Sequence, residues 1–492
     1  MVFSSQLFIF CFLPAVLLLY YTVPGRHGRH GALTLVSYVF YGWANPLFVV
    51  LMFISTVIDY VCGLVMIGGL SPGSWGGSAP LLAPGGHRCR RQTIALTLSI
   101  VSNLSLLGFF KYFNLGAESY DSTVRWLHGT MGVDWLRPLN VALRVTLPLG
   151  ISFYTFQSMS YSIDVYRGQA RAIRNFVDFA CYVSMFPQLV AGPIIRFSEV
   201  AKQLEARSHT LTKFARGVAF LSLGLAKKVL LANPCGKIAD LAFDAAAPGV
   251  LGAWYGVTAY AFQIYYDFSG YSDMAIGLGL MLGFVFPRNF DSPYHSQSIT
   301  EFWRRWHISL SSWLRDYLYI PLGGNRKGPI RTYVNLMTVM LLGGLWHGAN
   351  WTFVIWGGIH GSMLAFERLL GQRHPLARCP RIVRTAVTFL VLLVTWVFFR
   401  CPTFTEALTY CGHMLGITPA AASTPVVRAL LCQPYLLLMF TVAAVITWGA
   451  PGTWEYTRVI RWPKALVLSA LLVVALAVLL TQEFNPFIYF IF

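Results

Sequence analysis

The chain has 492 residues, of which 56% are apolar and only 11% are charged, and its mean hydropathy is +0.58. A soluble domain carries about 25% charged residues, so this composition excludes one and predicts a polytopic membrane protein. The net charge of +18 would suit a nucleic-acid-binding protein, but the basic residues are spread over short loops between apolar segments. We therefore expect membrane lipids and not nucleic acid as partners.

Apolar segments long enough to cross or enter a membrane recur along the whole chain. They predict membrane helices at about 6–22, 31–43, 46–69, 93–113, 143–163, 214–232, 250–266, 332–346, 350–371, 382–399, 434–450 and 465–482. Two shorter or Gly- and Pro-interrupted stretches, 176–195 and 270–286, are expected to be re-entrant or buried helices. The sequence thus predicts an all-α polytopic protein with about 11–13 membrane helices. No linker divides it, so 1–492 is expected to be a single integral-membrane domain.

Basic loops alternate with loops that carry few charges. The positive-inside rule assigns the basic loops to the cytoplasm; their residues are Arg26, Arg29, Arg88, Arg90, Arg91, Arg167, Arg171, Arg174, Arg326, Lys327, Arg331, Arg378, Arg381, Arg384, Arg458, Arg461 and Lys464. Loops 115–140 and 401–433 are then expected outside, together with both termini. Residues 70–87, rich in Gly, Ser and Pro, are expected to form a flexible cytoplasmic loop.

The nine cysteines show no CxxC pair, and most lie in or beside apolar segments, which favours packing roles. Cys401 and Cys411 fall on the predicted outer side, and their spacing leaves open whether they pair. No set of His, Cys and acidic residues has convincing metal-ligand spacing, so no metal is expected.

His347 lies in a run without acidic or basic residues between Arg331 and Glu367. An imidazole there loses its water unless a partner or a cavity replaces it, and such groups are usually kept for proton transfer, ion passage or ligand binding. The alternative is a histidine that hydrogen-bonds a neighbouring helix for packing. If Arg331 marks the cytoplasmic boundary, His347 lies about 24 Å further along a straight helix, beyond the midplane of a hydrocarbon core of about 30 Å.

Polar residues concentrate between 261 and 350. Asp267 and Asp273 are expected to break an apolar region, and helix capping explains these carboxylates about as well as catalysis does. A capping box at Ser298-Ile-Thr-Glu301 predicts the start of a helix that runs over 300–317. An aromatic face of this helix lies beside a polar face, which predicts a place at the membrane interface or in a wet cavity. The polar face carries Arg304, His307, Ser311 and Arg315.

These residues suit acyl transfer. A neutral imidazole can take the proton from a hydroxyl as it attacks an activated carbonyl, which we expect of His347 with His307 as helper. An interfacial position explains His307 equally well. Four cations are expected to offer a cytoplasmic rim for the phosphates of a coenzyme donor, although lipid headgroups explain them too. They are Arg304, Arg305, Arg326 and Lys327.

Two sequence blocks carry a resemblance to a known family: WRRWHISLSSWLRDYLYIPLGGN at 303–325 and GGLWHGAN at 343–350. They resemble the signature blocks of the membrane-bound O-acyltransferase superfamily, and the chain is similar to its bacterial alginate O-acetyltransferase branch. Supporting blocks follow in family order at 1–5, 147–156, 163–167, 190–193, 266–277 and 485–490. Segments 401–480 and 70–87 resemble the family little in detail.

The resemblance implies a ring of tilted helices around a central tunnel, with the motif core at about 261–371. His347 matches the invariant family histidine and His307 the second one. The resemblance also implies a bacterial inner membrane location and acetyl-coenzyme A as donor substrate. The acetyl group would reach an exported polysaccharide directly or through periplasmic acetyltransferase partners that work with the export machinery.

Two other functions stay open at this point. Within the enzyme class, the acceptor can be teichoic acid, as in D-alanyl transfer, or a lipid or protein hydroxyl. Outside it, a proton-coupled transporter would use His347 as a relay. The absence of internal repeats counts against a transporter, and the sequence does not identify the polymer.

Overall fold

The computed structural model describes residues 1–43, 45–69, 79–133, 135–141, 144–371, 375–419, 424–482 and 484–486. Every regular element within these ranges is a helix, so the predicted all-α class is confirmed. Part of the predicted loop 70–87, namely 70–78, lies outside the described residues.

The first half of the chain forms short and long helices in alternation. They are η1 (Phe8–Phe12), α1 (Leu13–Thr22), α2 (Arg26–Gly42), α3 (Pro46–Met66), α4 (Arg90–Met131), α5 (Ile151–Arg167), α6 (Phe176–Ser184), α7 (Phe186–Leu189), α8 (Phe197–Glu205), α9 (Leu211–Ala226), the π-helical turn η3 (Lys227–Ala232) and α10 (Asn233–Phe243).

The second half contains the two histidine blocks. Its elements are α11 (Gly249–Met281), η4 (Pro293–His295), α12 (Ile299–Arg305), α13 (Ile308–Leu314), η5 (Arg315–Tyr319), α14 (Pro329–His347), α15 (Trp351–Leu370), η7 (Pro375–Arg378), α16 (Arg381–Arg400), α17 (Phe404–Leu415), α18 (Thr424–Leu431), α19 (Pro434–Gly449), α20 (Thr453–Tyr456) and α21 (Trp462–Thr481).

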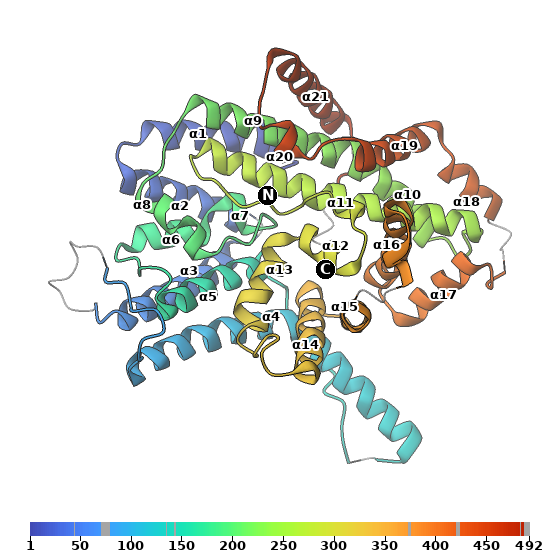
Figure 1. Cartoon of the computed structure of the whole chain (residues 1–492), viewed down its shortest axis with the longest axis horizontal. Coiled ribbons are helices and arrows are strands. Elements are labelled where there is room, and N and C mark those ends of the chain that lie inside the picture. Colours follow the sequence, from blue (N-terminus) through green and yellow to red (C-terminus); the bar gives the residue numbers. More distant parts are fainter. Residues whose placement is uncertain are drawn as a thin grey trace.

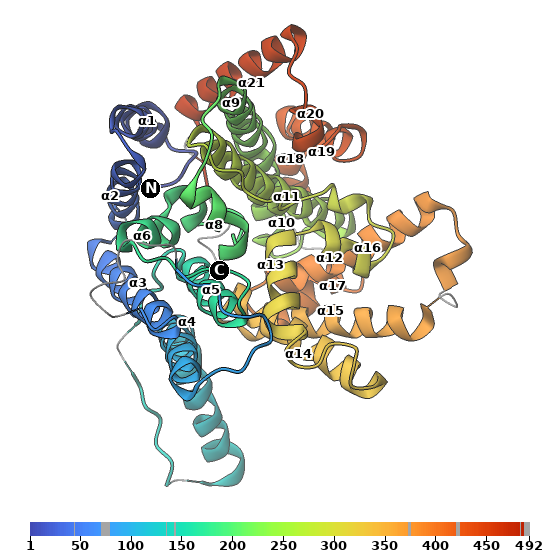
Figure 2. The same ribbon diagram turned by 60° about the vertical axis from the view of Figure 1, so that its left-hand side comes forward.

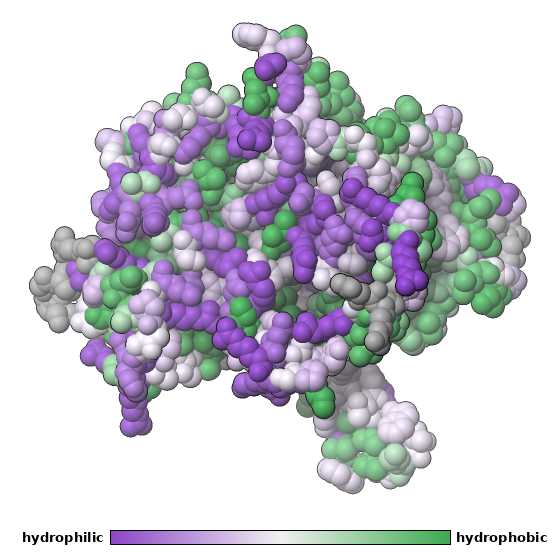
Figure 3. Space-filling view, viewed as in Figure 1, coloured by the Kyte–Doolittle hydropathy of each residue, from purple (hydrophilic) through white to green (hydrophobic). Residues whose placement is uncertain are grey.

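The helices are arranged around the short helices α12 and α13, which occupy the middle of the molecule (Figure 1). The helices α1 to α3 and α5 to α8 lie on one side of this centre and α15 to α17 on the other, while α4 passes below it in Figure 1, toward α14 (Figures 1 and 2). Hydrophilic residues gather over the middle of the face seen in Figure 3, and hydrophobic residues are frequent toward its right-hand rim, over α16 to α19. This distribution suits a protein with an apolar rim in the bilayer and a polar face toward water.

Four helices among the described residues are long and apolar enough to cross a membrane: α3, α4, α16 and α21. Two shorter apolar helices cover Phe8–Thr22 and Pro434–Gly449. Most other segments predicted to span also form helices, α14 and α15 among them, with bounds close to those expected. The total of 11–13 membrane helices stays a prediction.

The expected break at Asp267–Asp273 is wrong, because α11 runs without interruption from Gly249 to Met281. The two carboxylates are neutralised by consecutive lysines of η3: Lys228 Nζ lies 2.8 Å from Asp267 Oδ1, and Lys227 Nζ lies 2.7 Å from Asp273 Oδ2. With their charges paired, the carboxylates can remain within a buried helix. Residues 270–281, expected to be a re-entrant or buried helix, are the buried last part of this helix and not a separate re-entrant one.

The expected outer loop at 115–140 is also partly wrong, because α4 continues as a helix to Met131 and projects beyond the rest of the molecule (Figures 1 and 2). The returning chain packs back onto this projection. The Asp121 carboxylate accepts hydrogen bonds from the backbone N–H groups of Leu139 and Asn140, at 2.6 and 3.1 Å. These contacts give the last part of α4 partners that do not depend on the body of the protein.

Glycines bring α9 and α11 into backbone contact at two levels. A methyl group added at Gly224 would lie 2.5 Å from the carbonyl oxygen of Gly270, and one added at Gly217 would lie 2.6 Å from that of Gly277. Small residues at such spacing let membrane helices approach closely. This contact holds α11, whose Phe268 lies beside His307, against its neighbour.

All nine cysteines are free thiols, including Cys401, which is buried, and Cys411. The first and last described segments lie together. The side-chain amide of Asn485 donates to the carbonyl of Ser4 at 2.8 Å, and that of Gln6 donates to Leu479 at 3.5 Å.

Candidate functional site

His307 occupies a break between two helices. The single helix expected over 300–317 is wrong: α12 ends at Arg305, and α13 starts at Ile308. The backbone of His307 is left-handed, with φ of 44°, and its side chain is fully buried and not interfacial. Such a conformation costs energy for a residue other than Gly, so surrounding contacts must hold it. The backbone N–H of Ile308 donates to the Asn289 carbonyl at 2.9 Å and supplies one of these contacts.

Asn289 also fixes the imidazole of His307. Its side-chain oxygen accepts from the backbone N–H of Ser309 at 3.3 Å and from the Ser309 hydroxyl at 2.8 Å, which identifies this atom as the amide oxygen. His307 Nδ1 lies 3.2 Å from the same oxygen and must therefore donate to it. The proton sits on Nδ1, and Nε2 keeps a lone pair. Among the described residues, Nε2 has no hydrogen-bond partner.

His347 is the last residue of α14, and its side chain is 9% exposed. Its ring centroid lies 6.5 Å from that of His307, so the structure brings the two predicted histidines together. Trp346 borders both rings, at 5.9 Å from His307 and 5.1 Å from His347. Trp356 and Phe399 contact the His347 ring edge-on, at 5.3 and 5.4 Å. These aromatic walls exclude water around the pair.

A cavity of about 450 Å³ leads to His347. One wall is a face of α14, formed by Leu336, Val339, Met340 and Gly343, and the opposite wall comes from α12 and α13. Arg304, Arg315 and Tyr319 also line the cavity. Its lining is almost wholly apolar apart from these groups, Thr300 and the serines of α13. His307 is not part of the lining, so His347 is the histidine that a molecule in this cavity would meet.

The four predicted phosphate-binding cations do not all lie at this cavity. Arg304 is exposed and lines it. Arg305 instead pairs with Glu301 at 2.8 Å and donates to the Asp291 carbonyl at 3.2 Å. Arg326 and Lys327 are exposed in the turn after η5 and do not line the cavity.

Arg315 lines the cavity together with Arg304. The sequence pattern places Arg315 on the polar face of the predicted helix, but it is not one of the four predicted phosphate-binding cations. It pairs with Asp316 at 2.7 Å, and Arg196 pairs with the same carboxylate at 2.5 Å. Burial raises the pKa of Asp316, but hydrogen bonds and attraction from Arg315 and Arg196 outweigh burial and hold that pKa below its ordinary value. The carboxylate therefore stays charged at neutral pH and fixes both arginines near the cavity.

Two residues that the sequence reasoning missed hold the end of α14. The ammonium of Lys111 donates to the carbonyls of Trp346 and, at 3.3 Å, of His347. The hydroxyl of Tyr112 donates to the Leu345 carbonyl at 2.8 Å. A signal was available, because Lys111 is the only charged residue within the predicted span 93–113. Ionisable residues inside membrane segments are rare and usually functional.

His360, also on an apolar helix, has a packing role. Its ring is fully buried, Trp303 Nε1 donates to its Nδ1 at 3.3 Å, and Trp356 lies 4.7 Å away. It lines no part of the cavity that reaches His347.

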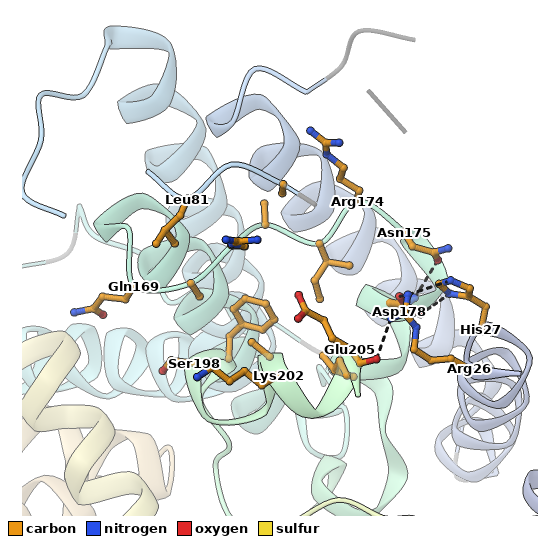
Figure 4. Close-up of a pocket in the computed structure, with 18 residues that line it drawn as sticks. Arg26, His27, Leu81, Gln169, Arg174, Asn175, Asp178, Ser198, Lys202 and Glu205 are labelled. Atoms are coloured by element: carbon orange, nitrogen blue, oxygen red, sulfur yellow. Dashed lines mark hydrogen bonds and ion pairs between the residues drawn. The ribbon is translucent and has the colours of Figure 1, made fainter. Parts of the chain in front are cut away.

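A larger cavity of about 850 Å³ lies between α2, α6 and α8 (Figure 4). Arg26, Lys202 and Glu205 are among its lining residues, and Asp178 lies on its wall. The Asp178 carboxylate already accepts from His27 at 3.0 Å and from the buried His30 at 2.6 Å. The lining of this cavity includes neither histidine of the pair, whereas the smaller cavity reaches His347.

Comparisons with known proteins identify the family to which the chain belongs. The model of the membrane-bound O-acyltransferase family matches residues 95–405. The chain is 43% identical to a probable alginate O-acetylase of Azotobacter vinelandii over the whole of both chains. It is 35% identical to a peptidoglycan O-acetyltransferase of Helicobacter pylori, covering 85% of this chain and 80% of that one. A teichoic acid D-alanyltransferase of Streptococcus thermophilus is more distant, at 30% identity over 44% of this chain and 56% of that one.

The family match covers α12 to α15, and with them both histidines and the cavity that leads to His347. The chain therefore belongs to the membrane-bound O-acyltransferase family, and it is a polytopic membrane acyltransferase.

Proposed function

We propose that this protein moves an acetyl group from acetyl-coenzyme A in the cytoplasm to a hydroxyl outside the membrane, for O-acetylation of an exported, alginate-like polysaccharide. The observation that carries the proposal is the buried histidine pair, of which His347 alone lines the cavity. The similarity over full length to an alginate O-acetylase supports the acetyl group and the class of acceptor.

His347 acts as the general base. It takes the proton of the acceptor hydroxyl as the hydroxyl oxygen bonds to the thioester carbonyl carbon. The tetrahedral intermediate then collapses, the C–S bond breaks, and the coenzyme thiolate receives the proton from the imidazolium. Thioester and alcohol thus become ester and thiol, with no net change in protons.

His307 assists. No hydrogen bond joins the two imidazoles among the described residues, and their centroids lie 6.5 Å apart. His307 does not line the cavity, so it would not contact the donor there; it lies beside His347 instead. With Nδ1 held as a donor by Asn289, His307 Nε2 is the ring atom that is left to accept a hydrogen bond from the acceptor hydroxyl.

The donor enters along the cavity from its basic end. The apolar wall from Leu336 to Gly343 suits the narrow pantetheine arm, and Arg304 and Arg315 suit the phosphates. Lys327 and Arg326 would add positive potential further out and attract the donor without touching it, whereas the charge of Arg305 is paired with Glu301. In this arrangement the whole chain, 1–492, works as one domain with its core at 261–371.

The proposal includes a bacterial inner membrane with both termini outside. The hydrogen bond between Asn485 and Ser4 supports a common side for the two ends. The acetyl group would reach the polymer directly or through periplasmic acetyltransferase partners attached to the export machinery.

Purified protein in detergent tests the proposal. Without any membrane potential, the wild type should transfer acetyl from acetyl-coenzyme A to an oligouronate or hydrolyse the thioester slowly. His307→Ala should lower the rate strongly, and His347→Ala should abolish it. A monodisperse wild type that binds no acetyl-coenzyme A, but moves protons across proteoliposomes in a His347-dependent way, would instead show a transporter.

A further inference from the structure

The end of α14 is held by a cation from another helix. The helix stops at His347, and its last carbonyls have no partner within the helix. The Gly344 carbonyl accepts the Gly348 N–H, but the carbonyls of Leu345, Trp346 and His347 receive their hydrogen bonds from α4. Every main-chain acceptor in the turn that carries His347 is thereby satisfied.

Burying the charged side chain of Lys111 at this place costs free energy. Its side chain is buried in a candidate membrane span, and a buried ammonium costs several kcal/mol unless it is paired. None of the ion pairs among the described residues involves Lys111. Its charge is balanced by the two carbonyls at the negative end of α14 and by the Trp346 ring, whose centroid lies 5.8 Å from Nζ.

The contacts of Lys111 reach the histidine pair through Trp346. That indole touches both imidazoles, and its own carbonyl is one of the two acceptors of the ammonium. The turn after His347 is attached to the same helix α4, because Trp351 Nε1 donates to the Ser119 hydroxyl at 3.2 Å. Movement of the Lys111 head would therefore displace Trp346 and the His347 backbone together.

We propose that Lys111 is a positioning residue for acyl transfer, which holds the last turn of α14 so that His347 faces the cavity beside His307. The inference rests on the proposed function. Lys111 does not line the cavity, so it acts on the reaction through His347 and not by contact with a substrate there. A displacement of about 1 Å in a reacting group can cost on the order of 100-fold in rate.

The test measures kcat and donor KM separately for Lys111→Arg, Lys111→Gln and Lys111→Met, per folded molecule. Arginine keeps a cation with several donors, so its kcat should stay within about threefold of wild type. Glutamine keeps a neutral NH2 donor but not the charge and should lose roughly tenfold, and methionine, which has no donor, should lose on the order of 100-fold. The KM for acetyl-coenzyme A should remain within about twofold in all three, because Arg304 and Arg315 are untouched.

Two variants on α4 serve as controls. Ser119→Ala removes the exposed contact to Trp351, and Tyr112→Phe removes a neutral donor to the Leu345 carbonyl; each should cost less in kcat than Lys111→Met. If Lys111→Met does not yield monodisperse protein, the difference in kcat between Lys111→Arg and Lys111→Gln tests the inference in its place. Wild-type kcat in the glutamine or methionine variant, or a raised KM at constant kcat, would overturn the inference. A wild type that transfers no acetyl group would contradict the proposed function itself. If the wild type is active and His347→Ala is inactive, the proposed function holds, and the Lys111 variants then test the role of Lys111 alone.

Discussion

Replacing Asn289 by leucine should reverse the tautomer of His307 while keeping the branched shape of the side chain. In the wild type, the Asn289 oxygen accepts from His307 Nδ1 and from the Ser309 hydroxyl. Without that oxygen, the hydroxyl can turn to His307 Nδ1, which lies 3.4 Å away. The ring would then carry its proton on Nε2, and the atom that served as acceptor would become a donor.

The magnitude follows from two hydrogen bonds. A bond that stabilises the active tautomer is lost and one that stabilises the inactive tautomer is gained, each at about 1 kcal/mol. A change from about 1 kcal/mol in favour of the active tautomer to about 1 kcal/mol in favour of the inactive one lowers the active fraction from about 0.85 to about 0.15, which is roughly fivefold in rate. Acetyl transfer by purified protein should therefore fall roughly fivefold in kcat, with donor KM unchanged, because the cavity wall does not include Asn289.

Three comparison variants identify the cause. Asn289→Asp keeps an acceptor for Nδ1 and should retain most of the activity. Ser309→Ala leaves the bond between Asn289 and His307 in place and should have a small effect. The double variant Asn289→Leu with Ser309→Ala removes the competing donor and should be more active than Asn289→Leu alone. Equal loss in the leucine and aspartate variants, or no gain in the double variant, would refute the tautomer argument.

Three further predictions concern the base, the donor entrance and the helix contact. His347→Ala should reduce transfer by at least about 100-fold while the protein still accumulates in the membrane; substantial acetylation by a well-expressed variant would contradict its role as base. Arg304→Glu should raise the donor KM, and more so at low salt, whereas Arg326→Glu should change the donor KM less. Equal changes in KM for the two variants, measured by steady-state kinetics, would mean that lining the cavity gives Arg304 no special role in donor binding. Gly277→Ala should lower the thermal midpoint in detergent, because its methyl group meets the carbonyl of Gly217 at 2.6 Å; an unchanged midpoint would show that α9 and α11 separate at little cost.

The features that the sequence predicted well are those written in local patterns. Apolar length predicted helices such as α14 and α15 with nearly correct bounds. The free-energy cost of burying an imidazole in a run without charged residues can be judged from the sequence alone, and this cost is why the sequence draws attention to His347. The two histidine blocks, forty residues apart, were expected in one site, and the structure places their rings 6.5 Å apart.

The features that sequence reasoning missed depend on contacts between distant segments. The 3.6-residue period continues through Trp306 and His307, and only the contacts from Asn289 explain why the helix breaks there. Asp267 was expected to interrupt α11 because its partner, Lys228, lies on a different helix. Which cations line the cavity likewise depends on side-chain pairing. Arg305, for example, forms a salt bridge with Glu301 and does not line the cavity that leads to His347.

The contact between Ser4 and Asn485 joins positions 481 residues apart, so it can form only after the whole chain between them has been made. Asn233 lies beside this contact, with its amide 3.0 Å from Gln482 and 3.2 Å from Asn485. During synthesis the bundle therefore cannot close along this seam before α21 has been made. Contacts of such sequence separation slow folding, and linking the two ends would make closure an early event. A circularly permuted chain, opened instead at Gly132 on the tip of the α4 projection, would keep every helix intact and should assemble through a different last step.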